Sequence, residues 1–268
     1  MIPEYYIKEW HDLVPWNTDA MVEQDLIICK ALVCIFGDEF LASQLAFRGG
    51  TALHKLYLRP QQRYSEDIDL VQINPGPIKP ILLRLGEVLS WLPDKVTKQK
   101  RYNNTMLFRM ESEVPPVQPL RLKVEINCYE HFCVLGLQKV PFEVRNPWFN
   151  GRCEITTYAL DELVGTKLRA LYQRKKGRDL FDLQVALQSG RLDVLRVMEC
   201  FQKYMGFVVN KVPTYKQYVQ NMEEKMQDDE FLGDMELLLR EDAGRFNPIE
   251  AYAQVRAAFI EQLPGKRE

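Results

Sequence analysis

The 268-residue sequence lacks most features that mark secreted, membrane-bound and zinc-binding proteins. Its six cysteines form no Cys-x-x-Cys pair, so we expect reduced, buried thiols and no zinc site. No run of 18 apolar residues occurs, and the first ten residues, MIPEYYIKEW, are too polar for a signal peptide. These absences predict a soluble cytoplasmic protein without a membrane segment.

The sequence also lacks an excess of either charge and the fingerprints of several common enzyme classes. Its net charge of −2 gives no overall attraction to nucleic acid, so any such contact must come from a local basic patch. It contains no P-loop, no Rossmann fingerprint and no Ser/His/Asp arrangement, and its three histidines are scattered. An apolar content of 46% is ordinary for a globular protein of one large or two small domains.

The most informative stretch is residues 45–73, LAFRGGTALHKLYLRPQQRYSEDIDLVQI. Its first apolar residues predict a short strand, which Gly49 and Gly50 break before a helix with apolar residues at helical spacing. Glycines allow backbone N–H groups to approach an anion closely, and a helix N-terminus favours phosphate. The alternation of acidic and apolar residues over 67–70 predicts a second strand with Asp67 and Asp69 on one face.

The paired aspartates predict a site for a divalent cation. Their Cα atoms would lie about 6.5–7 Å apart, and carboxylates at that spacing repel unless a cation lies between them. Mg²⁺ (or Mn²⁺) suits such oxygen ligands, above all where a phosphate shares the coordination. Each motif alone has a simpler interpretation, a turn for Gly-Gly and a solvated face for Asp-x-Asp. Together they indicate nucleotidyl transfer from an NTP.

The segment GGTALHKLYLRPQQRYSEDIDL resembles the signature of the AbiEii/AbiGii toxin family, which includes MenT-like toxins. These proteins are nucleotidyltransferases of the DNA polymerase β-like superfamily. The segment departs from the common superfamily pattern by Thr51 and by a longer insert before Asp67, and that insert is itself typical of the AbiEii group. With a second match at 158–183, the resemblance covers about residues 20–185.

The resemblance implies roles for several residues of the first motif. Gly49, Gly50 and Thr51 would bind the β- and γ-phosphates, with Arg48 and Ser65 also contacting the nucleotide. Asp67 and Asp69 would be catalytic metal ligands. Superfamily members carry a third carboxylate on a neighbouring strand, and Glu125 in RLKVEINC takes that place. The alternative for Glu125 is an ion pair with a nearby Lys or Arg on a solvated sheet face.

The second match, YALDELVGTKLRALYQRKKGRDLFDL, places Lys167 at the edge of a buried helix face. The resemblance implies that Lys167 and a downstream aspartate are active-site residues, with the lysine neutralising charge on the triphosphate. Asp182 is our choice for that aspartate, and Asp179 is the alternative. The segment also holds a basic cluster that could bind RNA phosphates or form a solvated corner between helices: Arg169, Arg174, Lys175, Lys176 and Arg178.

Periodicity and breakers predict an α+β fold, with a mixed nucleotidyltransferase sheet and flanking helices followed by a helical C-terminal half. We expect residues 1–155 to form the nucleotidyltransferase domain, including an N-terminal arm over 1–17, and 156–268 to form the helical domain. Strands are predicted over 105–111, 121–128 and 132–140, with a boundary in the Pro/Asn/Gly-rich stretch 141–151. Helices are predicted from Thr18 or Asp19 to Phe36, from Pro77–Pro80 onward, and over 158–176, 178–189, 191–205, 214–227, 229–241 and 248–262.

The function predicted from these features is Mg²⁺-dependent transfer of a nucleoside monophosphate from an NTP, with release of pyrophosphate. The resemblance implies a toxin of a type IV-like toxin–antitoxin or abortive-infection system used in phage defence. It also implies the tRNA 3′ end as acceptor and an AbiEi-like antitoxin as partner. Two alternatives remain: transfer to a protein or small molecule, and a catalytically inactive binding module. The intact Asp67, Asp69 and Lys167 argue against the second.

Overall fold

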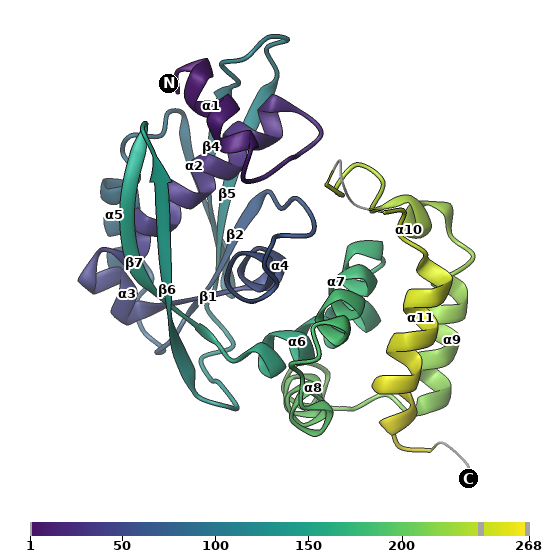
Figure 1. Ribbon diagram of the computed structural model, residues 1–268. Coiled ribbons are helices and arrows are strands. Elements are labelled where there is room, and N and C mark those ends of the chain that lie inside the picture. The colour runs from purple at the N-terminus through teal and green to yellow at the C-terminus, as the bar shows by residue number, and fades with distance from the viewer. Residues whose placement is uncertain (1, 241–243, 266–268) are drawn as a thin grey trace. The chain divides into compact units, whose positions relative to one another are not determined.

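The computed structural model describes residues 2–240 and 244–265, and its chain forms two compact units. Unit 1 comprises Met1–Tyr158 with Arg240–Asp242, and unit 2 comprises Ala159–Leu239 with Ala243–Glu268. Unit 1 carries a seven-stranded mixed sheet with the N-terminal helices, whereas unit 2 is helical (Figure 1). The predicted α+β class is therefore confirmed.

The sheet of unit 1 has the strand order β3-β4-β5-β2-β1-β7-β6. β2 runs antiparallel to β1 and parallel to β5, while β1 runs parallel to β7. The remaining neighbours pair antiparallel. The strands are β1 (Leu45–Arg48), β2 (Asp67–Gln72), β3 (Lys95–Gln99), β4 (Asn103–Glu111), β5 (Pro119–Asn127), β6 (Leu137–Asn146) and β7 (Phe149–Tyr158).

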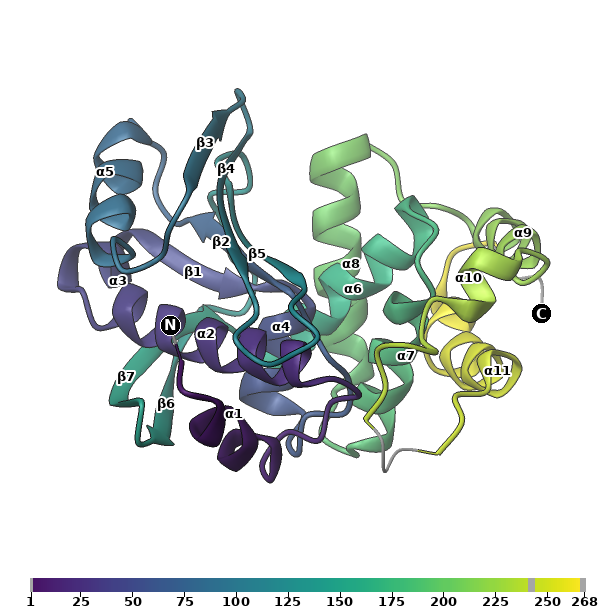
Figure 2. The ribbon, with the colours of Figure 1, turned by 90° about the horizontal axis from the view of Figure 1, so that it is seen from above.

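Helix α2 (Asp19–Phe36) is the main helical support of the sheet and contacts β5, β6 and β7 (Figure 2). It begins and ends as predicted, since the Thr18 side chain accepts a hydrogen bond from the Met21 N–H and Gly37 follows its last residue. The predicted N-terminal arm contains a helix, α1 (Glu4–His11), which packs on α2. The other helical segments of unit 1 are α3 (Glu39–Gln44), α4 (Gly49–Ala52), the π-helix η1 (Leu53–Tyr57) and α5 (Lys79–Val88).

Alternation along β2 and β5 separates an apolar face from a polar one. Ile68, Leu70, Val124 and Ile126 are at most 1% exposed and belong to the core. The intervening residues are polar, and the register places Asp67 beside Lys123 and Asp69 beside Glu125. Because side chains alternate along a strand, these four polar residues share the opposite face of the sheet. This face carries the candidate site.

Two parts of unit 1 differ from the prediction. Residues 141–151 are not a boundary but the middle of a hairpin in which β6 pairs with β7 over their whole length. Pro141 is tolerated because β6 is an edge strand, where a missing N–H breaks no ladder in the sheet interior. β3, at the other edge, was not predicted because its sequence KVTKQ is almost entirely exposed and lacks apolar alternation.

Unit 2 contains helices near all the predicted positions: α6 (Leu160–Gln173), α7 (Gly177–Gln188), α8 (Val194–Val209), α9 (Tyr215–Lys225), α10 (Asp229–Gly233) and α11 (Pro248–Ala258), followed by a 3₁₀ turn, η2 (Ile260–Gln262). The predicted helix over 229–241 is too long, because α10 ends at Gly233 and turns follow. The end of that predicted helix, residue 241, lies outside the described residues. No helix within residues 2–240 and 244–265 is long and apolar enough to span a membrane.

Candidate active site

The turn after β1 brings Gly49 against Asp69. Arg48, the last residue of β1, pairs with Asp69 in the antiparallel ladder, so the next residue lies over the Asp69 side chain. Gly49 adopts φ +81°, and a Cβ atom there would lie 2.3 Å from Asp69 Oδ2. Both the backbone conformation and the lack of space therefore require glycine. The predicted phosphate cradle and the predicted metal ligand are neighbours in the structure.

The Thr51 hydroxyl connects the start of the helix with the strand that carries the aspartates. Thr51 is only 1% exposed, and its Oγ1 donates a hydrogen bond of 2.6 Å to the backbone carbonyl of Asp67. Its Oγ1 also lies 2.5 Å from Ser65 Oγ, and because its only hydrogen points to Asp67, Ser65 is the donor. Any contact of Thr51 with a phosphate is therefore left to its backbone N–H.

The polar face of β2 and β5 holds three carboxylates around one lysine. Lys123 Nζ lies 3.0 Å from Asp67 Oδ2 and 3.1 Å from Glu125 Oε2. Asp69 forms no ion pair with any described residue. Burial and the neighbouring Asp67 raise the pKa of the Asp69 carboxyl above its usual value. Among the three carboxylates, Asp69 is thus the one whose charge most needs a cation.

Glu125 is held by two donors of its own unit. Asn103 donates a hydrogen bond to Glu125 Oε1, and Lys123 contacts the other carboxylate oxygen. Burial acts to raise the pKa of the Glu125 carboxyl, but the hydrogen bonds from Asn103 and Lys123 outweigh it and keep this pKa below its usual value. The geometry is that of the ion pair considered as the alternative for Glu125 in the sequence.

Arg48 also has a carboxylate partner. Its guanidinium pairs with Glu130, which is 3% exposed and lies just beyond the end of β5. Burial lowers the pKa of the Arg48 guanidinium, but the charge of Glu130 and its hydrogen bond more than compensate and raise it. The Arg48 side chain is thus oriented by Glu130 at the same strand end as Asp69, with which Arg48 is in register.

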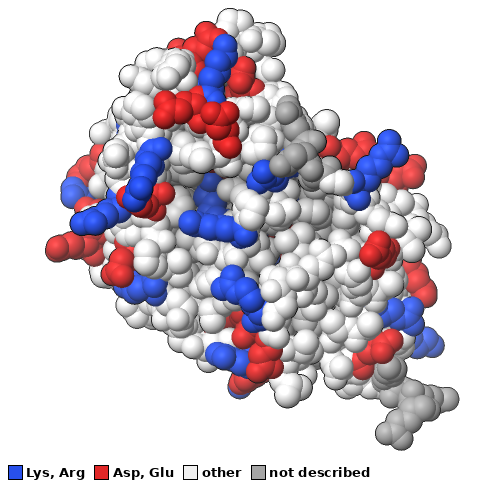
Figure 3. All heavy atoms as spheres, viewed as in Figure 1, with Lys and Arg blue, Asp and Glu red and all other residues white. Residues whose placement is uncertain are grey.

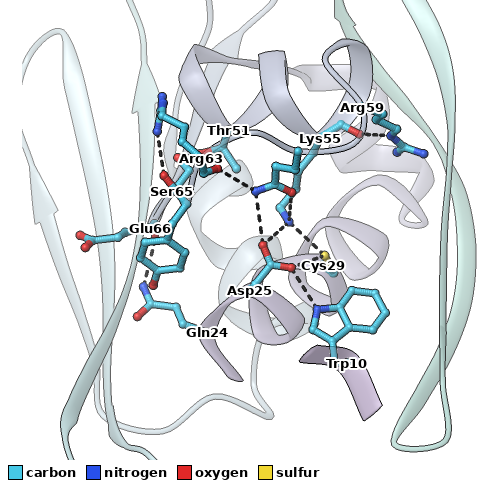
Figure 4. Close-up of polar contacts among 12 residues, drawn as sticks. Trp10, Gln24, Asp25, Cys29, Thr51, Lys55, Arg59, Arg63, Ser65 and Glu66 are labelled. Atoms are coloured by element: carbon cyan, nitrogen blue, oxygen red, sulfur yellow. Dashed lines mark hydrogen bonds and ion pairs between the residues drawn. The ribbon is translucent and has the colours of Figure 1, made fainter. Parts of the chain in front are cut away.

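A buried network behind the site was not predicted from the sequence. Figure 4 shows Asp25 of α2 and Lys55 of η1 pointing toward one another, with Trp10 of α1 beside them. Lys55 Nζ lies 2.8 Å from Asp25 Oδ2 and 3.2 Å from Cys29 Sγ, while Trp10 Nε1 donates to Asp25 Oδ1 over 3.1 Å. The ion pair is almost fully buried, with side-chain exposures of 3% and 0%. The ion pair fastens η1, which directly follows the Gly49–Ala52 turn in the chain, to α2.

The insert before β2 is fastened to the same network. Gln61 contacts Lys55 Nζ through its carbonyl oxygen at 3.4 Å and Asp25 through its amide nitrogen at 3.5 Å (Figure 4). Nearer the strand, the Gln24 amide donates to the backbone carbonyls of Glu66 and Arg121 over 3.3 and 2.9 Å. The loop that carries Ser65 and leads into Asp67 is therefore held at both ends by side chains from α2.

In unit 2, Lys167 of α6 lies between two aspartates of α7. Its Nζ is 3.0 Å from Asp179 Oδ1 and 2.9 Å from Asp182 Oδ2. The lysine side chain is 7% exposed and both aspartates are fully buried. Burial opposes ionisation of Asp179, but the Lys167 charge and the Arg174 hydrogen bonds keep its pKa below the usual value. Both candidates for the downstream aspartate thus contact Lys167.

The predicted basic cluster is paired with acidic side chains of the same unit. Arg174 binds both oxygens of Asp179 at 2.7 and 2.8 Å. Lys175 lies 2.6 Å from Asp228, Lys176 lies 3.2 Å from Glu230, and Arg178 lies 3.8 Å from Asp234. The Arg169 guanidinium lies over the Tyr204 ring. On the right of Figure 3, over α9 to α11, blue side chains likewise lie beside red ones.

Comparison with known proteins assigns this chain to a family. Residues 30–259 match the family described as nucleotidyl transferase AbiEii toxin, type IV TA system. The chain belongs to the AbiEii family. It is thus a nucleotidyltransferase-family enzyme and a toxin of the type IV toxin–antitoxin class, and the resemblance seen in the sequence is confirmed. A search of curated proteins gave no match.

Solved structures share the AbiEii fold at low sequence identity. MenT4, a nucleotidyltransferase toxin from Mycobacterium tuberculosis H37Rv, is 16% identical with a TM-score of 0.67, covering 99% of this chain and 91% of its own. JHP933 from Helicobacter pylori is 18% identical with a TM-score of 0.53, covering 91% of each chain. A putative nucleotidyltransferase from H. pylori is 17% identical with a TM-score of 0.52, covering 90% of this chain and 93% of its own. These similarities establish the fold.

The residues of this AbiEii chain fit a metal ion in part. Asp67 and Asp69 offer carboxylate oxygens on one face beside the Gly49 turn, which suits Mg²⁺ bound through two carboxylates and substrate phosphates. Glu125 fits less well, because both of its oxygens already have partners. Over the described ranges 2–240 and 244–265, no three His, Cys, Asp or Glu side chains are grouped so as to hold a metal.

The six cysteines take no part in such a site. All of them lie in the described part of the chain, and all are free thiols. Cys29 and Cys200 are buried and the other four are partly exposed. Burial raises the pKa of the Cys29 thiol to about 12, so this sulfur is a poor nucleophile although it touches Lys55.

Proposed function

We propose that this protein transfers a nucleoside monophosphate from an NTP to an acceptor hydroxyl in a Mg²⁺-dependent reaction. The observation that carries the proposal is the contact of the Gly49 turn with Asp69, because it joins a phosphate cradle to a metal-binding carboxylate. In the reaction, the acceptor oxygen bonds to the α-phosphorus and the bond to the β-phosphate oxygen breaks. Pyrophosphate leaves and the hydroxyl proton is released.

In this proposal Asp67 and Asp69 hold the metal, which when bound supplies positive charge to the phosphates. Gly49, Gly50 and Thr51 present backbone N–H groups to the β- and γ-phosphates, with Arg48 and Ser65 beside them. Asp69 lies against Gly49, and the backbone carbonyl of Asp67 accepts the Thr51 hydrogen bond, so β2 helps to orient the turn.

Lys167 is proposed to neutralise charge on the triphosphate, and Asp182 is proposed to orient it. The two short contacts that Lys167 makes with Asp179 and Asp182 support a fixed, charged lysine. Lys167 lies 2.9 Å from Asp182 and 3.0 Å from Asp179, so both carboxylates can orient it, and Asp179 remains the alternative to Asp182.

The proposed acceptor is the tRNA 3′ end, bound in part by Arg169, Arg174, Lys175, Lys176 and Arg178. A protein or small-molecule acceptor is the second candidate. It is favoured by one observation: the acidic partners of these cations leave less positive charge available to RNA phosphates. We further propose a cytoplasmic role in abortive infection and phage defence, with neutralisation by an AbiEi-like antitoxin.

The experiment is to incubate the purified protein with each of the four α-³²P-labelled NTPs, Mg²⁺, and either total cellular RNA or total protein. We expect label from one or more NTPs in the tRNA fraction, absent with EDTA and absent in Asp69→Asn. Label only in protein would identify the second candidate. No labelled product in either RNA or protein with any NTP would overturn the proposed tRNA acceptor and leave a small-molecule acceptor or a binding module.

A further inference from the structure

Lys123 occupies the position between two carboxylates where a cation would otherwise be needed. Its ammonium lies 3.0 Å from Asp67 and 3.1 Å from Glu125. The strand register produces this arrangement, because β5 runs parallel to β2 with Lys123 in register with Asp67 and Glu125 in register with Asp69. The three side chains are each about one-third exposed, at 34%, 37% and 30%, so they line the surface of the site rather than the core.

Both oxygens of the Glu125 carboxylate already have a partner of the same unit. Asn103 donates to Oε1 and Lys123 contacts Oε2, so each oxygen already has a partner. The Asn103 side chain reaches Glu125 because Asn103 lies at the start of β4, one strand further along the sheet. These two donors fix the Glu125 carboxylate against Lys123. The fixed Glu125 carboxylate in turn holds the Lys123 ammonium in place.

The charges of this face match a single divalent ion. Three carboxylates carry −3 and Lys123 carries +1, which leaves −2. Arg48, whose charge also acts on Asp69 and Glu125, is balanced by Glu130 and does not change this sum. In the protein without nucleotide, one Mg²⁺ or Mn²⁺ would neutralise the face, whereas two would leave an excess of +2 close to an ammonium group. A second divalent ion and the Lys123 ammonium would repel each other strongly where solvent is partly excluded.

We propose that Lys123 takes the place of the second metal ion, so that Asp67 and Asp69 hold one divalent cation and Glu125 serves to position Lys123. This inference rests on the proposed function above, since it concerns the metal of that reaction. Lys123 then supplies, on the β5 side of the site, the positive charge that a second metal ion would otherwise supply.

The test is the number of Mn²⁺ ions bound per chain, measured by electron paramagnetic resonance of free Mn²⁺ during titration of the full-length protein. We expect one ion in the wild type. Lys123→Met removes the ammonium and leaves three unneutralised carboxylates, so two ions are expected over the same concentration range. Lys123→Met combined with Glu125→Gln removes the carboxylate as well and should return the number to one.

A matched control is Arg121→Met, which removes one positive charge from an exposed position of the same strand, two residues before Lys123. It should bind one ion with unchanged affinity. Two ions in the wild type, or one ion with unchanged affinity in Lys123→Met, would overturn the inference and leave metal-dependent transfer intact. No Mn²⁺ binding in any variant would overturn both. Thermal unfolding of each variant reports whether it is folded.

Discussion

Gly49 and Asp69 are so close that no side chain fits between them, since a Cβ atom at position 49 would lie 2.3 Å from Asp69 Oδ2. We therefore expect Gly49→Ala to displace the Asp69 carboxylate and to abolish nucleotidyl transfer. Gly136→Ala is a matched control, because Gly136 has the same φ of +81° but no atom within 4 Å of the added Cβ.

Both of these variants carry the same backbone strain, about 1–2 kcal/mol for an L-residue in the left-handed region. In urea unfolding, the free energy of unfolding should decrease by this amount for Gly136→Ala and by at least as much for Gly49→Ala. Transfer of labelled NMP should fail only in Gly49→Ala. Wild-type transfer by Gly49→Ala would show that the turn has no role in binding phosphate.

Lys167 is expected to be important for stability as well as for transfer. Lys167→Met would leave Asp179 and Asp182 buried with less positive charge, and breaking a buried pair in this way costs about 3–5 kcal/mol. Adding Asp182→Asn to Lys167→Met should recover part of this stability, because Arg174 still balances Asp179. Urea unfolding of the two variants measures the difference. If Lys167→Met unfolds like the wild type, Lys167 does not balance the buried charges of Asp179 and Asp182.

The Asp25–Lys55 pair should control the mobility of the insert before β2. Asp25→Asn removes the charge that holds Lys55 and weakens the contact with Gln61, so amide exchange over residues 58–66 should become faster. The control is Arg84→Met, which breaks the exposed pair with Asp38 and should change stability by at most about 1 kcal/mol. Hydrogen exchange with mass spectrometry follows both. Unchanged exchange in Asp25→Asn would mean that the network does not hold the loop.

The basic cluster allows a test of RNA binding that spares the buried charges. Lys175→Met with Lys176→Met leaves the Arg174–Asp179 pair intact. If tRNA phosphates bind these lysines, the slope of log affinity against log salt should flatten by about 0.7–0.9 for each phosphate that the variant no longer binds. Replacing Lys203 and Lys216, two exposed lysines of unit 2, by Met is the control for net charge. Equal slopes in all three proteins would favour an acceptor other than RNA.

Lys225 gives the protein a pH-dependent stability above neutrality. Burial lowers the pKa of this ammonium from 10.5 to about 8. Between these values the unfolded chain binds more protons than the folded one, so the free energy of unfolding should rise as pH increases from about 8 to 10.5. Neutral Lys225 keeps two N–H donors, enough for the Leu171 and Tyr172 carbonyls at the end of α6. Lys225→Met should lack this rise relative to the wild type in urea unfolding at several pH values.

Much of the site's local structure could be predicted because it depends on short-range patterns. The alternation of Asp67 to Leu70 defined β2, and Gly49 defined the turn into α4. Thr18 defined the start of α2 by its capping hydroxyl. Each of these signals lies within a few residues of the feature that it predicts. The same holds for the helices of unit 2, whose apolar spacing is regular.

What the sequence did not predict depends on contacts between distant positions. Asp25 and Lys55 are 30 residues apart and meet only because α2 packs behind η1. The contacts of Lys123 with Asp67 and of Asn103 with Glu125 were not predicted, because they need the strand register. The acidic partners of Lys175 and Lys176 are more than 50 residues further along the chain. Propensity and periodicity carry no information on such pairs.

The hydrogen bond from Thr51 to the backbone of Asp67 should couple the binding of nucleotide to the binding of metal. This hydrogen bond joins the Gly49–Ala52 turn, which is proposed to bind phosphate, to β2, which is proposed to bind the metal. A shift of either element is therefore transmitted to the other. Nucleotide and metal should therefore bind cooperatively, and by thermodynamic reciprocity each should raise the affinity of the other by the same factor. A single threonine would set the size of that factor without touching either ligand through its side chain.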